Sequence, residues 1–303
     1  MIDFHRVSIE DKDRYNEILM SQPARGCEYS FVNLCLWGRQ QIAYLHGCAA
    51  IFSHYNGRSL YPYPIGSGDR KAVLEAIMAD AEERGIPCRI ACICEHDRQE
   101  LEDWFPGLFT LRPIRDTADY VYDISDLAEL KGRKFQRKRN HLNRFRLNHE
   151  NCLAEPITGD NLEEVKEMVE DWYDAKAISN PDGDYLLERI ALERAFCKYE
   201  QLGLEGLLLR EDGRILAMTM ASPMGPDTYD VHFEKAREDV DGAYAAINSE
   251  FAAYLRQKHD DLRFLDREDD MGLEGLRRAK LSYNPHHMVD KYWAFLGEDM
   301  DEI

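Results

Sequence analysis

The sequence lacks the features that mark membrane, secreted and metal-bound proteins. No run approaches the roughly 18 to 20 apolar residues that a membrane helix needs. The amino terminus is charged from Asp3 onward and has no apolar stretch, so no secretory signal is predicted. The eight cysteines form no CxxC pair, and we interpret them as reduced core thiols rather than metal ligands. We therefore expect a cytoplasmic protein without a metal or redox cofactor.

Positive charge is scarce overall but concentrated in one segment. The net charge of −19 argues against indiscriminate binding to nucleic acid. Residues 131–149 (KGRKFQRKRNHLNRFRLNH) reverse this balance with eight Lys or Arg and no acid. Phe135, Leu142 and Phe145 recur there at helical spacing. This pattern predicts a helix with one packed stripe and a basic remainder.

Two interpretations of the basic helix stay open. In the first, it is a linker helix that pairs with acidic surface of its own chain. In the second, Lys134, Arg137, Lys138 and Arg139 bind a polyanion such as tRNA, a nucleotide-bearing donor or an anionic headgroup. The second interpretation also allows peripheral contact with a membrane.

The length and the element pattern predict two domains. A chain of 303 residues exceeds the usual size of a single domain. The change of composition near the basic helix supports a division into residues 1–125 and 126–303. The first half alternates strands and helices like an α/β layer, with residues 119–124 as its last strand. No group of residues in this half predicts a chemistry.

The second half has a more readable order of strands and helices. From residue 152 to residue 295 the predicted order is βααβββαβαβ, which is the N-acyltransferase order of the GNAT type without its last strand. On the predicted strand at residues 229–235, alternation places Asp230, His232 and Glu234 on one face. A polar row inside an apolar sheet is costly unless it lines a site. We therefore predict a site on this face.

Residues 266–270 (DREDD) place a dense group of charges between a predicted strand and a predicted helix. We expect the helix at residues 272–281, with Leu273, Leu276 and Leu281 facing inward. The acids taken singly fit a helix N-terminus, where they complement the macrodipole.

Arg267 gives this loop a second interpretation. A guanidinium among carboxylates is suited to hold the carboxylate or phosphate of a substrate. Glu268 and Asp269 lie beside it in the sequence, and Lys280 and Tyr283 follow at the far end of the helix. We predict substrate binding by Arg267, Glu268, Asp269 and Lys280.

Three motifs in the second half carry a family resemblance. Together with the basic helix, they resemble the bacterial family that shares its domain with the carboxyl-terminal part of phosphatidylglycerol lysyltransferases. Those enzymes transfer an aminoacyl group from aminoacyl-tRNA to a lipid headgroup. The resemblance implies an α/β fold of two tandem GNAT-like domains, with mixed central sheets flanked by helices. The motifs are VHFEKA (residues 231–236), GAYAAIN (residues 242–248) and REDDMGLEGLRRAKLSYNP (residues 267–285).

The resemblance also implies roles for single residues. The strand that carries Glu234 often supplies a carboxylate base in GNAT-like enzymes, so Glu234 is the expected base toward an attacking amine. His232 is the alternative base, although a strand histidine is more often structural. Tyr283 lies where this fold commonly places a general acid for the leaving group. Asn248 is the expected polar positioning group.

The donor and the activity stay open between three hypotheses. Acetyl-CoA enzymes carry a [QR]xxGx[GA] pattern before the helix that binds pyrophosphate. Here Asp239 and Asp241 precede Gly242 and Ala243, and two aspartates repel a pyrophosphate. Aminoacyl-tRNA is therefore favoured over acyl-CoA as the donor of an aminoacyl or acyl transferase. The alternatives are an acyl-CoA-dependent N-acyltransferase acting on a small amine and a non-catalytic ligand-binding module. The membrane-spanning part of the lipid enzymes is absent from this sequence, so a lipid acceptor is not implied.

Overall fold

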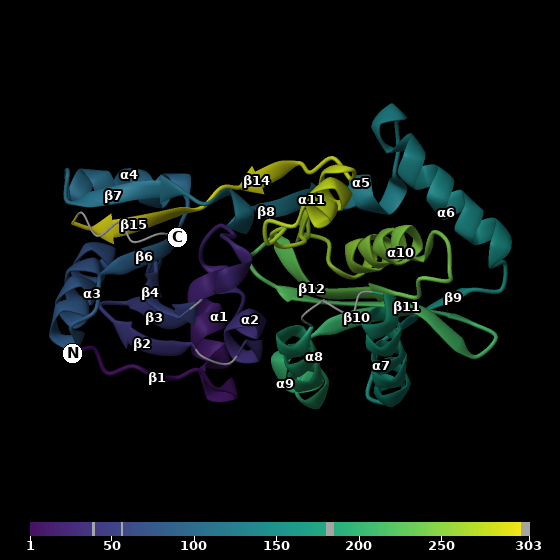
Figure 1. Ribbon diagram of the computed structural model, residues 1–303, viewed down its shortest axis with the longest axis horizontal. Coiled ribbons are helices and arrows are strands. Elements are labelled where there is room, and N and C mark those ends of the chain that lie inside the picture. Colours follow the sequence, from purple (N-terminus) through teal and green to yellow (C-terminus); the bar gives the residue numbers. More distant parts are fainter. Residues whose placement is uncertain (38–39, 56, 180–184, 298–303) are drawn as a thin grey trace.

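A computed structural model describes residues 1–37, 40–55, 57–179 and 185–297. Its two β-sheets lie side by side along the longest axis of the molecule, with helices on their faces (Figure 1). Both sheets are mixed, because each contains one parallel pair among antiparallel pairs. The predicted fold class, an α/β protein with mixed central sheets flanked by helices, is confirmed.

The first sheet has the order β1-β2-β3-β4-β6-β15-β7, and β5 pairs with β3 beside this path. Its parallel pair is β4 with β6. The strands are β1 (His5–Arg6), β2 (Gln41–Leu45), β3 (Cys48–Tyr55), β4 (Arg58–Pro62), β5 (Ile65–Gly66), β6 (Arg89–Ile93), β7 (Phe109–Pro113) and β15 (Tyr292–Leu296).

Of the helices of the first half, α3 packs its apolar side on this sheet, whereas α5 packs in the core of the second sheet. In α3, Asp69 caps the first turn by accepting a hydrogen bond from the Ala72 amide at 3.0 Å. The helix ends at Gly85, which takes the left-handed conformation with φ 67°. Leu74 and Ile77 are fully buried against the sheet. The helices are α1 (Lys12–Met20), α2 (Phe31–Leu36), α3 (Arg70–Arg84), α4 (Glu95–Trp104) and α5 (Ile124–Glu129).

The second sheet has the order β14-β8-β13-β12-β11-β10-β9, with β12 and β13 parallel. Figure 1 shows α10 on one face of this sheet and α7 and α8 on the other. The strands are β8 (Asp119–Asp123), β9 (Leu153–Pro156), β10 (Glu205–Glu211), β11 (Arg214–Pro223), β12 (Thr228–Ala236), β13 (Phe264–Asp266) and β14 (His287–Val289). The helices are α6 (Gln136–Asn148), α7 (Leu162–Ser179), α8 (Leu186–Cys197), α9 (Tyr199–Leu202), α10 (Ala243–Lys258) and α11 (Glu274–Leu281).

Two strands belong to the sheet of the other half of the chain. The prediction that residues 119–124 close the first half is wrong, because β8 pairs with β13 and β14 in the second sheet. The predicted final strand is divided, and its second part, β15, pairs with β6 and β7 in the first sheet. At this crossing the Lys291 ammonium lies 2.8 Å from an Asp119 carboxylate oxygen. The division at residue 125 therefore stays a prediction.

The basic helix α6 packs as its apolar stripe predicts. Phe135, Leu142 and Phe145 are all buried. At the start of α10, a Cβ on Gly242 would lie 2.6 Å from the His141 carbonyl oxygen, and the Gly242 φ is 84°. Only glycine satisfies both conditions, so the backbones of α6 and α10 approach closely there.

The expectation that leucines anchor α11 is wrong. Leu273 and Leu281 are 55% and 46% exposed, and α11 buries none of its residues. The helix is instead fixed by charge, since the Arg277 guanidinium forms a bidentate pair with Asp270 at 2.9 and 3.0 Å.

The described part of the chain contains no membrane-spanning helix and no disulfide. No helix there is long and apolar enough to cross a membrane. All eight cysteines are unpaired. Cys197 is exposed, so the expectation of core thiols is wrong for this residue.

Candidate functional site

A β-bulge in β12 divides its polar residues between two faces of the sheet. Phe233 pairs with Met220, and Val231 pairs with the next residue of β11, so His232 is the extra residue of a bulge. Asp230 and His232 face α2, whereas Glu234 faces α10. The prediction that the three share one face is therefore wrong, because the bulge interrupts the alternation.

On the α10 face, Glu234 is held by two side chains. Arg267 Nη2 donates to Glu234 Oε1 at 2.8 Å, and Asn248 Nδ2 donates to Glu234 Oε2 at 3.3 Å. The side chains of Arg267 and Glu234 are 14% and 11% exposed. The structure thus confirms that these two residues, 33 positions apart, lie together.

Two tyrosines and a lysine surround this ion pair. The guanidinium carbon of Arg267 lies 5.0 Å from the Tyr283 ring centroid and 5.7 Å from that of Tyr122. Lys138 Nζ lies 3.8 Å from the Tyr283 ring centroid. Such positions over aromatic faces are attractive for cations. Lys138 therefore connects the basic helix α6 to the Glu234 site.

The surroundings shift the proton affinity of two of these groups. Burial lowers the pKa of Lys138 to about 8, and the charge of Arg267 acts in the same direction while Glu234 opposes it. Burial raises the pKa of Tyr283 to about 12, against the effect of Arg267. Tyr283 is therefore a protonated phenol at neutral pH, which is the form that a general acid needs.

Two polar atoms beside Glu234 have no hydrogen-bond partner among the described residues. They are Arg267 Nη1, a donor, and Asn248 Oδ1, an acceptor. A buried polar atom without a partner costs about 1–3 kcal/mol. A bound molecule with one acceptor and one donor would satisfy both atoms, so the arrangement is suited to a ligand.

The other predicted binding residues contact the backbone of the loop at residues 267–271 or lie on the α2 face of the sheet. Lys280 Nζ donates to the backbone carbonyls of Arg267 and Asp269. Asp269 Oδ1 accepts from the Met271 amide at 3.0 Å. Glu268 Oε1 accepts from Asn33 at 2.9 Å on the α2 face. Substrate binding by Lys280, Glu268 and Asp269 remains a prediction.

The α2 face carries a polar network in which Asp230 Oδ1 has no hydrogen-bond partner among the described residues. Asn33 Nδ2 donates to Asp230 Oδ2 at 3.1 Å and to Glu268 Oε1 at 2.9 Å. His232 Nδ1 lies 3.2 Å from Asn33 Oδ1, and His232 Nε2 lies 2.8 Å from Ser222 Oγ. Both ring nitrogens of His232 are thus engaged, and its side chain is 1% exposed. Glu234 as the base and His232 as the alternative base both remain predictions.

Two groups of described residues have the atoms to hold a cation. In the first, the ligand atoms of Asp230, His232 and Glu268 lie within 4.8 Å of one another. In the second, formed by residues 27, 28 and 119, the Lys291 ammonium already lies 2.6 Å from Glu28 and 2.8 Å from Asp119. Sequence spacing missed both groups, because their members come from separate elements.

Four of the eight lysines and arginines of residues 131–149 form ion pairs within the chain. Arg139 donates to the Gly132 carbonyl at 3.0 Å. Arg133 and Arg137 are exposed and form no ion pair in the part of the chain that the structure describes. Both interpretations of the helix therefore keep support. The ion pairs are Lys131–Glu129, Lys134–Asp126, Arg144–Asp241 and Arg146–Glu250.

Three residues of these networks were not predicted as site residues. Tyr122 comes from β8, whose place in the second sheet was not foreseen. Asn33 lies in a short apolar helix, where one polar residue between buried neighbours was a usable signal. Lys291 lies between β14 and β15, and nothing in its local sequence indicates burial.

Comparison with solved structures identifies proteins that share this fold. A conserved protein of unknown function from Bacteroides thetaiotaomicron is 38% identical, with a TM-score of 0.92 over 98% of this chain and 100% of that chain. L-PGS from Bacillus licheniformis is 15% identical, with a TM-score of 0.68 over 95% of this chain and 92% of that chain. The second likeness shows that the two proteins share a fold.

Comparison of sequences gives the family. An uncharacterized protein from Mycoplasmoides gallisepticum is 27% identical over 195 residues, which are 64% of this chain and 61% of that protein. The match thus spans about three fifths of that relative. The family described as phosphatidylglycerol lysyltransferase, C-terminal, matches residues 21–295. The chain belongs to the family of the phosphatidylglycerol lysyltransferase C-terminal domain.

Proposed function

We propose that this protein transfers an aminoacyl group from aminoacyl-tRNA to an amine or hydroxyl acceptor at the Glu234 site. One observation carries the proposal. The Glu234 carboxylate is flanked by an unpartnered donor, Arg267 Nη1, and an unpartnered acceptor, Asn248 Oδ1. An acyl carbonyl and an amine supply the complementary pair of atoms. Membership of the family supports the aminoacyl donor.

The residues at the site suit the steps of acyl transfer. The acceptor nitrogen or oxygen attacks the ester carbonyl carbon, a new bond forms to that carbon, and the bond to the ribose oxygen of tRNA breaks. Glu234 takes the proton that the acceptor loses. Arg267 Nη1 donates to the oxyanion that develops on the carbonyl oxygen. Tyr283, which is protonated at neutral pH, gives a proton to the leaving ribose oxygen.

The basic helix supplies a path for the phosphates of the donor. Lys138 reaches the Glu234 site, and Arg133 and Arg137 are exposed on the same segment. Cations arranged in this way bind phosphates without reading a sequence. The acceptor end of tRNA would lie along α6 and place its ester at Glu234.

An acyl-CoA donor is the second candidate, and the structure of α10 disfavours it. The α6 backbone lies very close to Gly242. A Cβ on Gly242 would be 2.6 Å from the His141 carbonyl oxygen. The Asp241 carboxylate pairs with Arg144 at that point. A pyrophosphate at the start of α10 would meet a carbonyl and a carboxylate in place of free amides.

The proposal is tested by transfer of labelled amino acid from a panel of charged tRNAs to phosphatidylglycerol and to small amines. We expect Glu234→Gln to lower the transfer rate roughly 10²- to 10⁴-fold, because it keeps the shape and removes the base. Arg267→Lys should weaken binding, because an ammonium cannot replace the guanidinium fork. The matched control is Glu238→Gln, a surface carboxylate that pairs with Lys176.

Three outcomes count against the proposal. Equal rates for Glu234→Gln and wild type would exclude Glu234 as the base. Transfer from acyl-CoA but from none of the charged tRNAs would establish the second candidate. Binding of donors without transfer to any acceptor would favour the non-catalytic module.

A further inference from the structure

Three side chains with metal-binding atoms lie together on the α2 face of β12. They are Asp230, His232 and Glu268, whose ligand atoms lie within 4.8 Å of one another. His232 Nδ1 is 3.3 Å from Asp230 Oδ2 and 3.7 Å from Glu268 Oε1. Two ligand atoms that lie about 2.1 Å from one ion, at tetrahedral angles, are about 3.4 Å apart. The three atoms are thus spaced like the ligands of one ion.

The buried carboxyl groups of this region lack a cation. Asp230 and Asp266 are register partners on the parallel strands β12 and β13, and both are fully buried. Asp230 Oδ1 and Asp266 Oδ2 have no hydrogen-bond partner among the described residues. In the described part of the chain, no lysine or arginine forms an ion pair with Asp230, Asp266 or Glu268. Carboxyl groups buried side by side in this way favour the binding of a cation.

The two lysines that act on these carboxyl groups from a distance have other partners. Lys291 Nζ lies 2.8 Å from Asp119 and 2.6 Å from Glu28. Lys280 Nζ donates to two backbone carbonyls of the loop at residues 267–271. Neither lysine therefore takes the place of a cation among the three ligand atoms.

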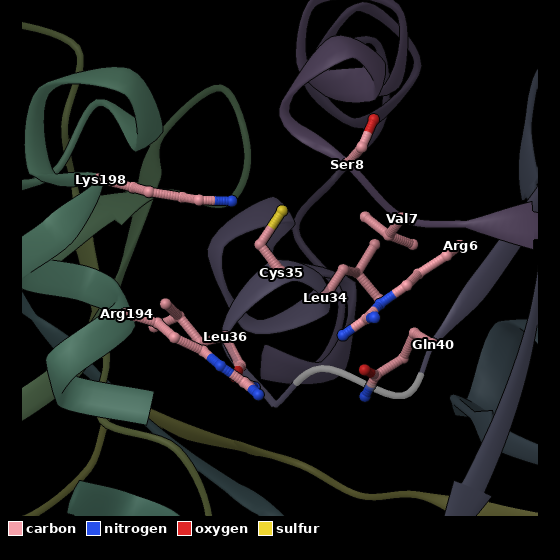
Figure 2. Close-up of a pocket in the computed structure, with 9 residues that line it drawn as sticks. All are labelled: Arg6, Val7, Ser8, Leu34, Cys35, Leu36, Gln40, Arg194 and Lys198. Atoms are coloured by element: carbon pink, nitrogen blue, oxygen red, sulfur yellow. The ribbon is translucent and has the colours of Figure 1, made fainter. Parts of the chain in front are cut away.

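The Asn33 amide does not supply enough donors for the acceptors around it. Its two N–H groups face three oxygens, which are the Cys27 carbonyl at 3.0 Å, Asp230 Oδ2 at 3.1 Å and Glu268 Oε1 at 2.9 Å. One of these oxygens therefore receives no hydrogen from Asn33. Residues 34–36 of the same helix line a cavity of about 200 Å³ (Figure 2). Helix α2 thus turns its polar residue toward the carboxyl groups and its next residues toward this cavity.

His232 is oriented as a metal ligand would be. Its Nε2 lies 2.8 Å from Ser222 Oγ, and metal-bound histidines almost always donate their second ring N–H to an oxygen. With its proton on Nε2, the ring directs the Nδ1 lone pair toward Asp230 Oδ2 at 3.3 Å and Asn33 Oδ1 at 3.2 Å. Electron pairs that face one another repel unless a cation lies between them. The Glu268 side chain is 25% exposed, so an ion can reach these atoms from solvent.

We propose that Asp230, His232 and Glu268 bind one divalent metal ion of the Zn²⁺ class through Oδ2, Nδ1 and Oε1. One imidazole with two carboxylates suits Zn²⁺, whereas Mg²⁺ prefers oxygen ligands and keeps its water. The ion replaces the Asn33 amide as the partner of both carboxylates and neutralises their charge. It therefore stabilises the α2 face.

The proposed ion is independent of the transfer reaction, because Glu234 lies on the other face of the sheet. The proposal also departs from the sequence-based expectation of a protein without a metal. That expectation rested on the spacing of the cysteines, and none of the three ligands is a cysteine.

The test is metal uptake by the full chain, freed of metal with a chelator and then dialysed against Zn²⁺, Mn²⁺ or Mg²⁺. We expect one Zn²⁺ per chain, weaker binding of Mn²⁺ and no binding of Mg²⁺ at the same concentration. Zn²⁺ should also raise the unfolding temperature in a saturable way, because it binds the folded state. A wild-type chain that takes up no Zn²⁺ overturns the proposal.

Three variants locate the ion. Asp230→Asn removes one ligand with little change of shape, and Glu268→Gln removes another at a partly exposed position. Each should raise the Kd for Zn²⁺ about tenfold or more, since even changes beyond the ligands cost this much metal affinity.

The matched control is Cys27→Ser, which alters the second group of potential ligands, formed by residues 27, 28 and 119. It should keep the wild-type Kd. If Asp230→Asn does not fold, Glu268→Gln alone decides. A wild-type Kd in Glu268→Gln, or loss of the ion in Cys27→Ser, overturns the proposal.

Discussion

The two faces of strand β12 hold carboxyl groups in opposite situations. On the α10 face, Glu234 has one cation and one amide for partners, and each of these keeps an unpartnered polar atom. On the α2 face, Asp230 and Glu268 share the Asn33 amide, and both ring nitrogens of His232 are engaged. The α10 face thus offers a ligand an unpartnered donor and an unpartnered acceptor, whereas the α2 face leaves a carboxyl oxygen, Asp230 Oδ1, without a partner among the described residues.

The protonation states widen this difference. Burial raises the pKa of Asp230 well above its usual value, with Glu268 and Asp266 acting in the same direction. Burial would also raise the pKa of Glu268, but hydrogen bonds with His232 and Asn33 hold it below its usual value. The α2 face thus favours the protonated form of Asp230, which limits its buried charge. A single bulge at His232 creates both environments within one strand.

The largest expected effect comes from breaking the ion pairs of Lys291 with Asp119 and Glu28. Lys291→Met removes the ammonium that contacts Asp119 and Glu28, and leaves buried carboxylates without a cation. We expect the free energy of unfolding to fall by about 3–5 kcal/mol, measured by urea denaturation at neutral pH. The double variant Lys291→Met/Asp119→Asn should recover part of this loss. A single variant as stable as wild type would show that the network does not hold the halves together.

A smaller loss is expected for Asn33→Ala, which removes the amide shared by Asp230 and Glu268. The partners left unsatisfied should cost about 1–3 kcal/mol in the free energy of unfolding. The matched change on the other face is Asn248→Ala, which removes a side chain with an unpartnered oxygen. It should cost less stability than Asn33→Ala, and the reverse order would contradict the contrast between the faces.

The pH dependence of stability should differ in sign between two adjacent aspartates of the loop. Burial raises the pKa of Asp269 from 3.8 to about 7, although Lys291 opposes the shift. Its contribution to stability is therefore complete below about pH 4 and is lost as the pH rises through about 7. Burial would also raise the pKa of Asp270, but hydrogen bonds from Arg277 and Tyr120 hold it well below its usual value.

Asp270 therefore contributes stability above about pH 4 that is lost as the pH falls. Unfolding of Asp269→Asn and Asp270→Asn across pH 2–8 checks both signs. The Asp269 variant should reduce the loss of stability between about pH 4 and 7, and the Asp270 variant should reduce the loss on the acid side. The same pH profile in both variants would refute the assignment.

The smallest effect is expected on the basic helix. Arg137→Gln should reduce the slope of log K for tRNA against log salt by about 1, because one phosphate contact is lost. Arg144 is already paired with Asp241, so Arg144→Gln should change the slope less. Equal slopes for Arg137→Gln and wild type would show that α6 does not bind tRNA through Arg137. The interpretation of α6 as a linker helix that pairs with acidic surface of its own chain would then be favoured.

The sequence was informative where a pattern is local. The apolar stripe of Phe135, Leu142 and Phe145 predicted the packing of α6, because helical periodicity needs no tertiary information. The closeness of Glu234 and Arg267 was predicted from the order of two neighbouring strands, and their ion pair follows from it.

The sequence was uninformative where the result depends on partners that are distant in the chain. The bulge at His232 depends on the register with β11, which alternation within β12 does not contain. The exchange of β8 and β15 between the sheets depends on non-local pairing. The outward Leu273 reflects the bidentate pair of Arg277 with Asp270, which outweighs the apolar pattern of a short helix.

The most direct test of the two-face contrast is the rate of aminoacyl transfer by Glu234→Gln and Asn33→Ala, each corrected for the folded fraction at the assay temperature. We predict that Glu234→Gln loses roughly 10²- to 10⁴-fold in rate after this correction. Asn33→Ala should lose stability and keep a corrected rate close to that of wild type. A corrected rate that falls as far in Asn33→Ala as in Glu234→Gln would show that the α2 face takes part in the chemistry.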